Sequence, residues 1–105
     1  DHFLSQVISL LNKRKSMLLY SADHGESLGE GGFYTHSVMS RPEQRHVPFI
    51  WWASDRFVAS NKTIQERLAA RKLDRISHDS IFHSVLDCAG ISSEVVDRRL
   101  SLCAD

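Results

Sequence analysis

The sequence lacks any hydrophobic run approaching the ~18 residues of a membrane-spanning helix, and it shows no signal peptide. It also lacks an excess of either charge, because 13 Lys and Arg residues balance 13 Asp and Glu residues. This balance gives no support for nucleic-acid binding through bulk electrostatics. The 105 residues, 42% of them hydrophobic and 25% charged, are typical of one ordinary globular segment with a modest core.

Cysteine is scarce: Cys88 and Cys103 are the two present, and their spacing matches no structural zinc motif. In an oxidising compartment they can pair, and closing a loop of about 15 residues would contribute about 3 kcal/mol to stability. The alternative is that Cys88 is a small buried residue and Cys103 is a free thiol on a loose tail. The spacing alone leaves both open.

Apolar periodicity predicts the first elements of the chain. Apolar residues at helical spacing predict a helix over residues 2–14, with Asp1 as its N-cap. The short, continuously apolar segment 17–21 predicts a central parallel strand that is buried on both faces. Residues 49–53, which follow a proline, predict the next strand. The order helix then strand is typical of an α/β fold with a parallel or mixed sheet.

The second half of the chain is predicted to be helical and then irregular. A thin apolar stripe predicts a surface helix at about residues 62–72. A better amphipathic helix is expected to begin after Ser77 and to end at Gly90, where a glycine C-cap fits. Residues 92–105 have few periodic apolar positions and are expected to form an irregular tail.

The long segment 22–47 carries most of the side chains that are suited to chemistry. Asp23 and His24 directly follow the first predicted strand, and α/β sheets bind ligands beyond the carboxyl ends of their strands. An Asp-His pair offers oxygen and nitrogen ligands that suit zinc or a similar divalent ion. The alternative is that these are turn residues in a glycine-permitted loop. Further carboxylates and a histidine follow in the same loop, at Glu26, Glu30 and His36.

Four motifs resemble the phosphoethanolamine transferases of the alkaline phosphatase and sulfatase superfamily. They are Ser21-Ala-Asp-His-Gly-Glu-Ser-Leu-Gly-Glu30, Tyr34-Thr-His36, Pro42-Glu-Gln-Arg-His-Val-Pro48 and Ser77-His-Asp-Ser-Ile-Phe-His-Ser-Val-Leu86. The resemblance implies that residues 1–105 are one partial domain, the C-terminal part of a sulfatase-like α/β/α sandwich with helices packed on a partial mixed sheet. We therefore expect a C-terminal fragment of a larger enzyme that is anchored in the bacterial inner membrane by a missing N-terminal region.

The resemblance also implies an activity. Such enzymes move phosphoethanolamine from phosphatidylethanolamine to lipid A or to a sugar of the lipopolysaccharide core, through a phospho-threonine intermediate. They use Zn²⁺, or another divalent cation such as Mn²⁺. Because the nucleophilic threonine and the other metal ligands of the family lie upstream, we expect an incomplete metal site and an inactive fragment. The periplasmic location that the resemblance implies favours a disulfide between Cys88 and Cys103.

Carried over by position, the resemblance makes Asp23 and His24 the metal ligands of this chain. His36 matches the histidine that contacts the phosphoethanolamine group and acts as acid or base. Glu26 and Glu30 match the motif with supporting roles. Two ligands are fewer than the four or so that zinc takes, so metal binding by the fragment alone is expected to be weak.

Two other functions compete with this interpretation. One is a sulfatase-like hydrolase or a phosphoglycerol transferase of the same superfamily. The other is a non-catalytic α/β interaction module, in which the Asp-His loop has only a structural role. As a fragment, the chain would leave the predicted strands at 17–21 and 49–53 without their sheet neighbours and with open edges, so we expect the isolated chain to self-associate.

Overall fold

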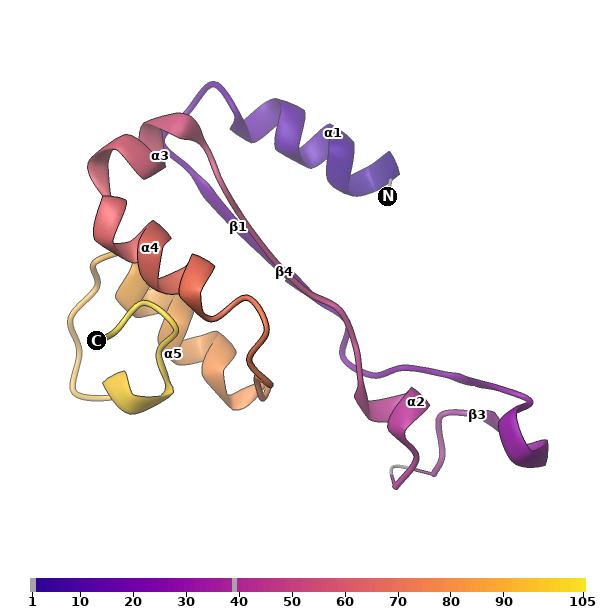
Figure 1. The fold of residues 1–105 in the computed structure, drawn as a ribbon. Helices are drawn as coiled ribbons and strands as arrows, with labels where there is room; N and C mark the ends of the chain where they lie inside the picture. The colour runs from indigo at the N-terminus through magenta and orange to yellow at the C-terminus, as the bar shows by residue number, and fades with distance from the viewer. Residues whose placement is uncertain (1, 39) are drawn as a thin grey trace. The chain divides into compact units, whose positions relative to one another are not determined.

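The computed structural model describes residues 2–38 and 40–105, so Asp1, the expected N-cap, lies outside the described residues. The chain divides into two compact units (Figure 1). The helical unit comprises Asp1–Met17 and Ala53–Asp105, and the loop unit comprises Leu18–Trp52.

Both predicted strands are present, as β1 (Met17–Ser21) and β4 (Phe49–Ala53), and they pair with each other. They run antiparallel, because the amide of Ser54, just after β4, donates to the carbonyl of Ser16, just before β1, at 2.9 Å. The parallel neighbour expected for β1 is not among the described residues. Most residues of β1 are half-buried rather than buried, since a strand with one neighbour leaves its other edge open.

The helical unit contains α1 (His2–Leu11), α3 (Asp55–Ser60), α4 (Lys62–Ala70) and α5 (Asp79–Cys88), followed by the 3₁₀ turn η2 (Arg98–Leu100). Helix α1 ends three residues before the predicted boundary at residue 14. None of the described helices combines the length and the apolar character that a membrane crossing needs.

The end of α5 confirms the predicted glycine cap. Gly90 has a φ of +75°, which is costly for any residue with a Cβ. Its amide donates to the carbonyl of Asp87 at 2.9 Å, and the amide of Ile91 donates to the carbonyl of Leu86 at 2.9 Å. These two bonds form the Schellman arrangement, which satisfies the last carbonyl groups of the helix.

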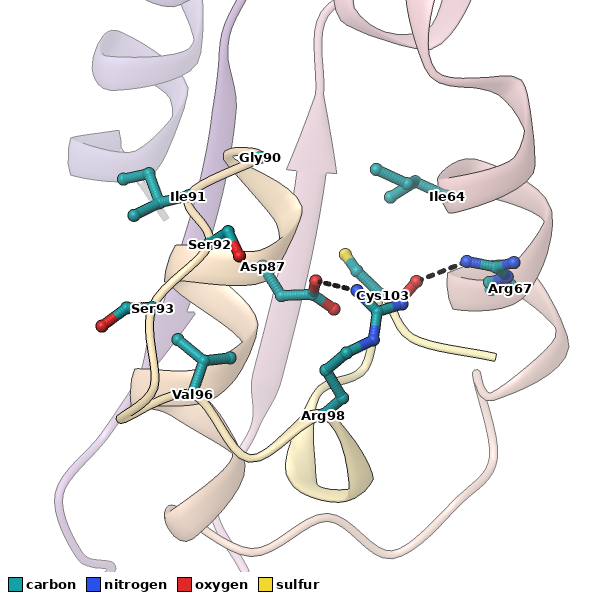
Figure 2. A pocket seen from close by; sticks show the side chains of 10 residues that line it. All are labelled: Ile64, Arg67, Asp87, Gly90, Ile91, Ser92, Ser93, Val96, Arg98 and Cys103. Carbon is teal, nitrogen blue, oxygen red and sulfur yellow. Dashed lines mark hydrogen bonds and ion pairs between the residues drawn. The ribbon is translucent and has the colours of Figure 1, made fainter.

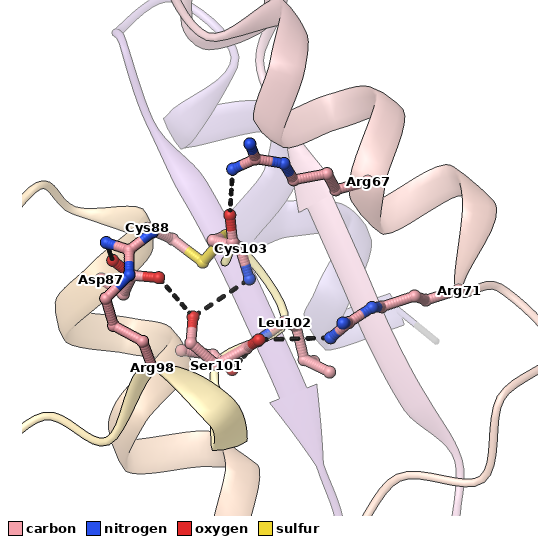
Figure 3. Close-up of a disulfide and its surroundings, with 9 residues drawn as sticks. Arg67, Arg71, Asp87, Cys88, Arg98, Ser101, Leu102 and Cys103 are labelled. Carbon is pink, nitrogen blue, oxygen red and sulfur yellow. Dashed lines mark hydrogen bonds and ion pairs between the residues drawn. A yellow bond between two sulfur atoms is a disulfide. The ribbon is translucent and has the colours of Figure 1, made fainter. Parts of the chain in front are cut away.

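The C-terminal segment 92–105 has irregular backbone apart from η2, but it is firmly attached to the helical unit (Figure 3). A disulfide joins Cys103 to Cys88 at the end of α5. The amide of Leu102 donates to Ser84 Oγ at 2.9 Å, and Arg67 Nη1 donates to the carbonyl of Cys103 at 2.8 Å. The alternative of a free thiol on a loose tail is therefore wrong, because residues 101–104 are buried.

The loop unit turns the predicted long loop into several short elements. They are β2 (Ser27–Leu28), the 3₁₀ turn η1 (Glu30–Gly32), β3 (Tyr34–Thr35) and α2 (Pro42–Arg45). Strands β2 and β3 form a two-pair antiparallel hairpin, with Ser27 opposite Thr35 and Leu28 opposite Tyr34. This hairpin positions the candidate site.

Candidate metal and substrate site

Three predicted site residues, His24, Glu26 and His36, converge in the loop unit. Each offers a ligand atom, and these atoms lie within 4.8 Å of one another. The rings of His24 and His36 stack with their centroids 4.2 Å apart and their planes at 28°. His36 Nδ1 lies 3.1 Å from Glu26 Oε2, which is a hydrogen bond. His36 thus shares one site with Glu26, 10 positions earlier in the sequence, and with His24, 12 positions earlier.

The His24 ring is held by the backbone of the next residue, Gly25. Its Nδ1 lies 3.0 Å from the carbonyl oxygen of Gly25, so the tautomer that donates this bond carries its proton on Nδ1. The lone pair on Nε2 is then free for an ion. A histidine that binds a metal through one ring nitrogen usually donates a hydrogen bond from the other, often to a carbonyl, and this bond orients the ring.

Asp23 lies beside this cluster without belonging to it. Its side chain is 90% exposed, and Oδ2 is 3.7 Å from His24 Nε2. Its Oδ1 accepts the His24 amide at 3.1 Å. Hydrogen bonds from the backbone amides of Asp23 and His24, together with the nearby His24 ring, hold the pKa of the Asp23 carboxyl below its usual range. The ionised carboxylate that a metal requires is therefore the favoured form.

Glu30 is not part of the converging group. Its Oε2 accepts the amide of Leu28 at 2.6 Å, and its carbonyl accepts Arg41 Nη2 at 2.8 Å. Arg41 also pairs with Glu43 and lies 4.2 Å from the centre of the Phe33 ring. Glu30 thus stabilises the hairpin turn.

The donor set of the cluster fits a divalent transition metal. Two imidazoles and a carboxylate are ligands that zinc and manganese accept, and three protein ligands with an open position are typical of catalytic zinc sites. His24, Glu26 and His36 are half-buried or exposed, so an ion and a substrate have access from solvent. Sequence reasoning grouped His24 with Asp23, whereas the structure also brings Glu26 and His36 to it.

Sequence reasoning missed two buried polar residues that are hydrogen-bonded to the segments of the site. Gln44 is 0% exposed and Ser27 is 1% exposed. Gln44 Nε2 donates to Ser27 Oγ at 2.6 Å. Gln44 belongs to the motif at 42–48, which could have drawn attention to it. Nothing local in the sequence, however, indicates that this glutamine is buried.

A hollow of about 340 Å³ lies in the helical unit (Figure 2). Two arginines, Arg67 and Arg98, are among the residues that line it. Arg98 Nη1 pairs with Asp87 Oδ1 at 2.9 Å, and Arg67 binds the Cys103 carbonyl and pairs with Asp105. Because these cations already have partners, the hollow is a weaker candidate site than the histidine cluster.

The chain is similar to known proteins over most of its length. The family model described as sulfatase matches residues 1–91. Phosphoethanolamine transferase EptA of Helicobacter pylori is 37% identical over 91 residues, which are 82% of this chain and 16% of that protein. Kdo(2)-lipid A phosphoethanolamine 7''-transferase of Salmonella typhimurium is 34% identical over 100 residues, which are 89% of this chain and 18% of that protein.

A solved structure is also similar. The soluble domain of lipooligosaccharide phosphoethanolamine transferase A from Neisseria meningitidis matches with a TM-score of 0.85 and 31% identity, over 96% of this chain and 33% of that chain. The chain therefore spans about a third of that domain, and 16% and 18% of the two curated relatives.

Proposed function

The chain belongs to the sulfatase family, and from that premise we propose that it carries part of the active site of a phosphoethanolamine transferase. The observation that carries the proposal is the convergence of His24, Glu26 and His36 within a segment that matches such transferases. The predicted resemblance is confirmed by these relatives, and the predicted α/β fold by the solved domain.

The proposed reaction moves phosphoethanolamine from phosphatidylethanolamine to lipid A or a lipopolysaccharide core sugar, through a phospho-threonine whose threonine lies outside this chain. The names of the relatives support the group transferred and the lipid A acceptor. We place the enzyme in the bacterial inner membrane, with this domain in the periplasm. There the open edges of β1 and β4 are covered by the rest of the enzyme, and the isolated chain self-associates.

A divalent metal, Zn²⁺ or Mn²⁺, would polarise a phosphoryl oxygen and stabilise the charge of the alkoxide. Asp23 and His24 are the proposed ligands, since Asp23 Oδ2 and His24 Nε2 lie 3.7 Å apart. In this arrangement Glu26 orients the His36 ring through the 3.1 Å bond to Nδ1. His36 Nε2 then faces the substrate and takes or gives a proton.

A second arrangement uses the converging group itself, with His24, Glu26 and His36 as ligands and Asp23 beside them. The two arrangements differ in which carboxylate is indispensable. We therefore compare zinc binding by calorimetry in the Asp23→Ala, His24→Ala and Glu26→Gln variants, with His46→Ala as the control. His46 is an exposed histidine of the same unit that lies outside the converging group.

We expect His24→Ala to abolish zinc binding. Zinc binding that is lost in Asp23→Ala and retained in Glu26→Gln would support Asp23 and His24 as the ligands. The reverse pattern would support His24, Glu26 and His36 as the ligands. Zinc binding that survives in all three variants would refute both arrangements and favour a structural role for the loop.

Activity is tested on the intact protein that carries this segment. Transfer of phosphoethanolamine to lipid A, lost in His24→Ala and kept in His46→Ala, is the expected result. Release of sulfate or transfer of glycerol phosphate would instead assign one of the competing superfamily activities. Full activity of the His24→Ala variant would contradict any catalytic role of this loop.

A further inference from the structure

One buried side chain, that of Gln44, connects the backbone segments that carry the converging site residues. Gln44 Nε2 donates to Ser27 Oγ at 2.6 Å and to the Thr35 carbonyl at 2.9 Å. Its Oε1 accepts the amide of Val38 at 2.9 Å. Both amide hydrogens are thus used, in a position that is 0% exposed.

Each site residue is the direct neighbour of a partner of Gln44. Glu26 precedes Ser27, and His36 follows Thr35. The third connection is through the backbone, because the carbonyl of Gln44 accepts the amide of Gly25 at 2.9 Å. Gly25 follows His24 in the sequence.

The hairpin needs such a support. It has two residue pairs, and two-stranded hairpins are at best marginally stable in water. Thr35 has a φ of 69° and is the one non-glycine residue with positive φ in the described part of the chain. A β-branched residue rarely adopts this conformation, which persists where surrounding contacts maintain it. The bond from Gln44 to the Thr35 carbonyl is such a contact.

We propose that Gln44 is a positioning residue of the site, which sets the spacing of His24, Glu26 and His36 through its hydrogen bonds to the segments that carry them. Its relevance to the reaction rests on the proposed function, whereas its effect on the geometry does not. Glutamine suits this position because one planar amide supplies two donors and an acceptor. Glutamate would have no hydrogen for the Thr35 carbonyl, and methionine would leave that carbonyl and the Val38 amide unpaired.

The test uses the Gln44→Met variant of this chain, which keeps the length of the side chain and removes its hydrogen bonds. The matched control is Gln65→Met in α4. Gln65 is half-buried, and its Oε1 is buried without a hydrogen-bond partner. Nitrogen-15 NMR of the histidine rings in the metal-free chain reports the His36–Glu26 hydrogen bond, and titration with Zn²⁺ alone reports the ligand geometry.

We expect Gln44→Met to change the His36 ring-nitrogen signals and to weaken zinc binding by about tenfold or more, as loss of a supporting contact does at metal sites. Gln65→Met should change neither. The proposal is overturned if Gln44→Met keeps the His24 and His36 signals and binds zinc within about twofold of the unmodified chain.

Two further outcomes are covered by the design. If Gln44→Met does not fold, Gln44→Glu, which retains the acceptor for the Val38 amide, is judged by the same two measurements. If the unmodified chain binds no zinc, the metal site needs ligands from outside this chain, and the zinc titration of each variant is made on the intact protein that carries this segment. The ring-nitrogen signals still decide the role of Gln44. Unchanged His36 signals in the Gln44 variant would refute the proposed positioning role.

Discussion

Apolar burial distinguishes the two units of the molecule. In the helical unit the buried residues include the apolar Phe57, Cys88, Leu102, Cys103 and Ala104 together with three serines, Ser54, Ser84 and Ser101. In the described part of the loop unit, the buried residues are the polar pair Ser27 and Gln44. Apolar burial is non-directional, whereas hydrogen bonds fix distances and angles. The unit that carries the site has no fully buried apolar residue among its described residues, so it depends more on directional interactions.

The largest effect that distinguishes the units should come from the disulfide. Replacing Cys88 and Cys103 together by serine removes a link across 15 residues, and we expect the free energy of unfolding to fall by about 3 kcal/mol. Urea unfolding followed by circular dichroism measures this loss. The histidine ring signals of the loop unit should stay the same under native conditions. A change in those histidine signals would show that loss of the disulfide also disturbs the loop unit.

A smaller effect should come from Gly25. A Cβ at this position would lie 2.1 Å from the carbonyl oxygen of Glu43, so Gly25→Ala must displace backbone. We expect a cost of about 1–3 kcal/mol and a loss of zinc affinity, because the bond to the Gln44 carbonyl is disturbed. Thermal unfolding and zinc titration test this together.

Gly90→Ala is the matched control for Gly25→Ala in the helical unit. Gly90 has a φ of +75°, but nothing lies within 4 Å of its added Cβ. Its substitution should cost roughly 1–2 kcal/mol from backbone conformation alone and leave zinc binding unchanged. Equal loss of zinc affinity in both variants would remove the distinction between the units.

The smallest effect should be the pH dependence due to Asp97. Its carboxylate accepts three hydrogen bonds from the Arg99 side chain, at 2.6, 3.0 and 3.2 Å, and one from the Arg99 amide at 3.0 Å, and these lower the pKa of Asp97 from 3.8 to about 2. A lowered pKa in the folded state contributes stability above about pH 3.8, and this contribution is lost as the pH falls towards 2. The Arg99 side chain is 88% exposed, so salt should weaken the effect.

The measurement for Asp97 is the difference in unfolding free energy between the unmodified chain and Asp97→Asn, from pH 6 to pH 2. The difference should be small and constant at the upper end and should disappear at the lower end. A difference that grows as the pH falls would contradict the assigned direction. His24 and His36 signals should not respond to this substitution.

Local signals in the sequence predicted the regular elements well. The strands at 17–21 and 49–53 have the predicted bounds, and Gly90 ends α5 as expected. The helix α3 was missed, because six residues are too few to show a period. Its start was nevertheless encoded, since Ser54 Oγ accepts the amide of Phe57 at 3.2 Å as an N-cap.

The candidate site was predicted in part. Sequence reasoning selected His24, Glu26 and His36, but it assigned the metal to the Asp23–His24 neighbours. Which residues meet across a hairpin depends on its register, and the register of β2 and β3 is set by the pairing of Ser27 with Thr35. Two-residue strands are too short for an apolar pattern to reveal that register.

By itself the sequence determined the kinds of side chain in the loop, the apolar runs that form strands and the glycines that end or bend segments. These follow from local sterics and from patterns a few residues long. Only the tertiary structure decided that Gln44 is buried, that it bonds Ser27, Thr35 and Val38, and that Cys103 meets Cys88. Those contacts join positions that are 6 to 17 residues apart, so their formation depends on the folded backbone rather than on any short pattern.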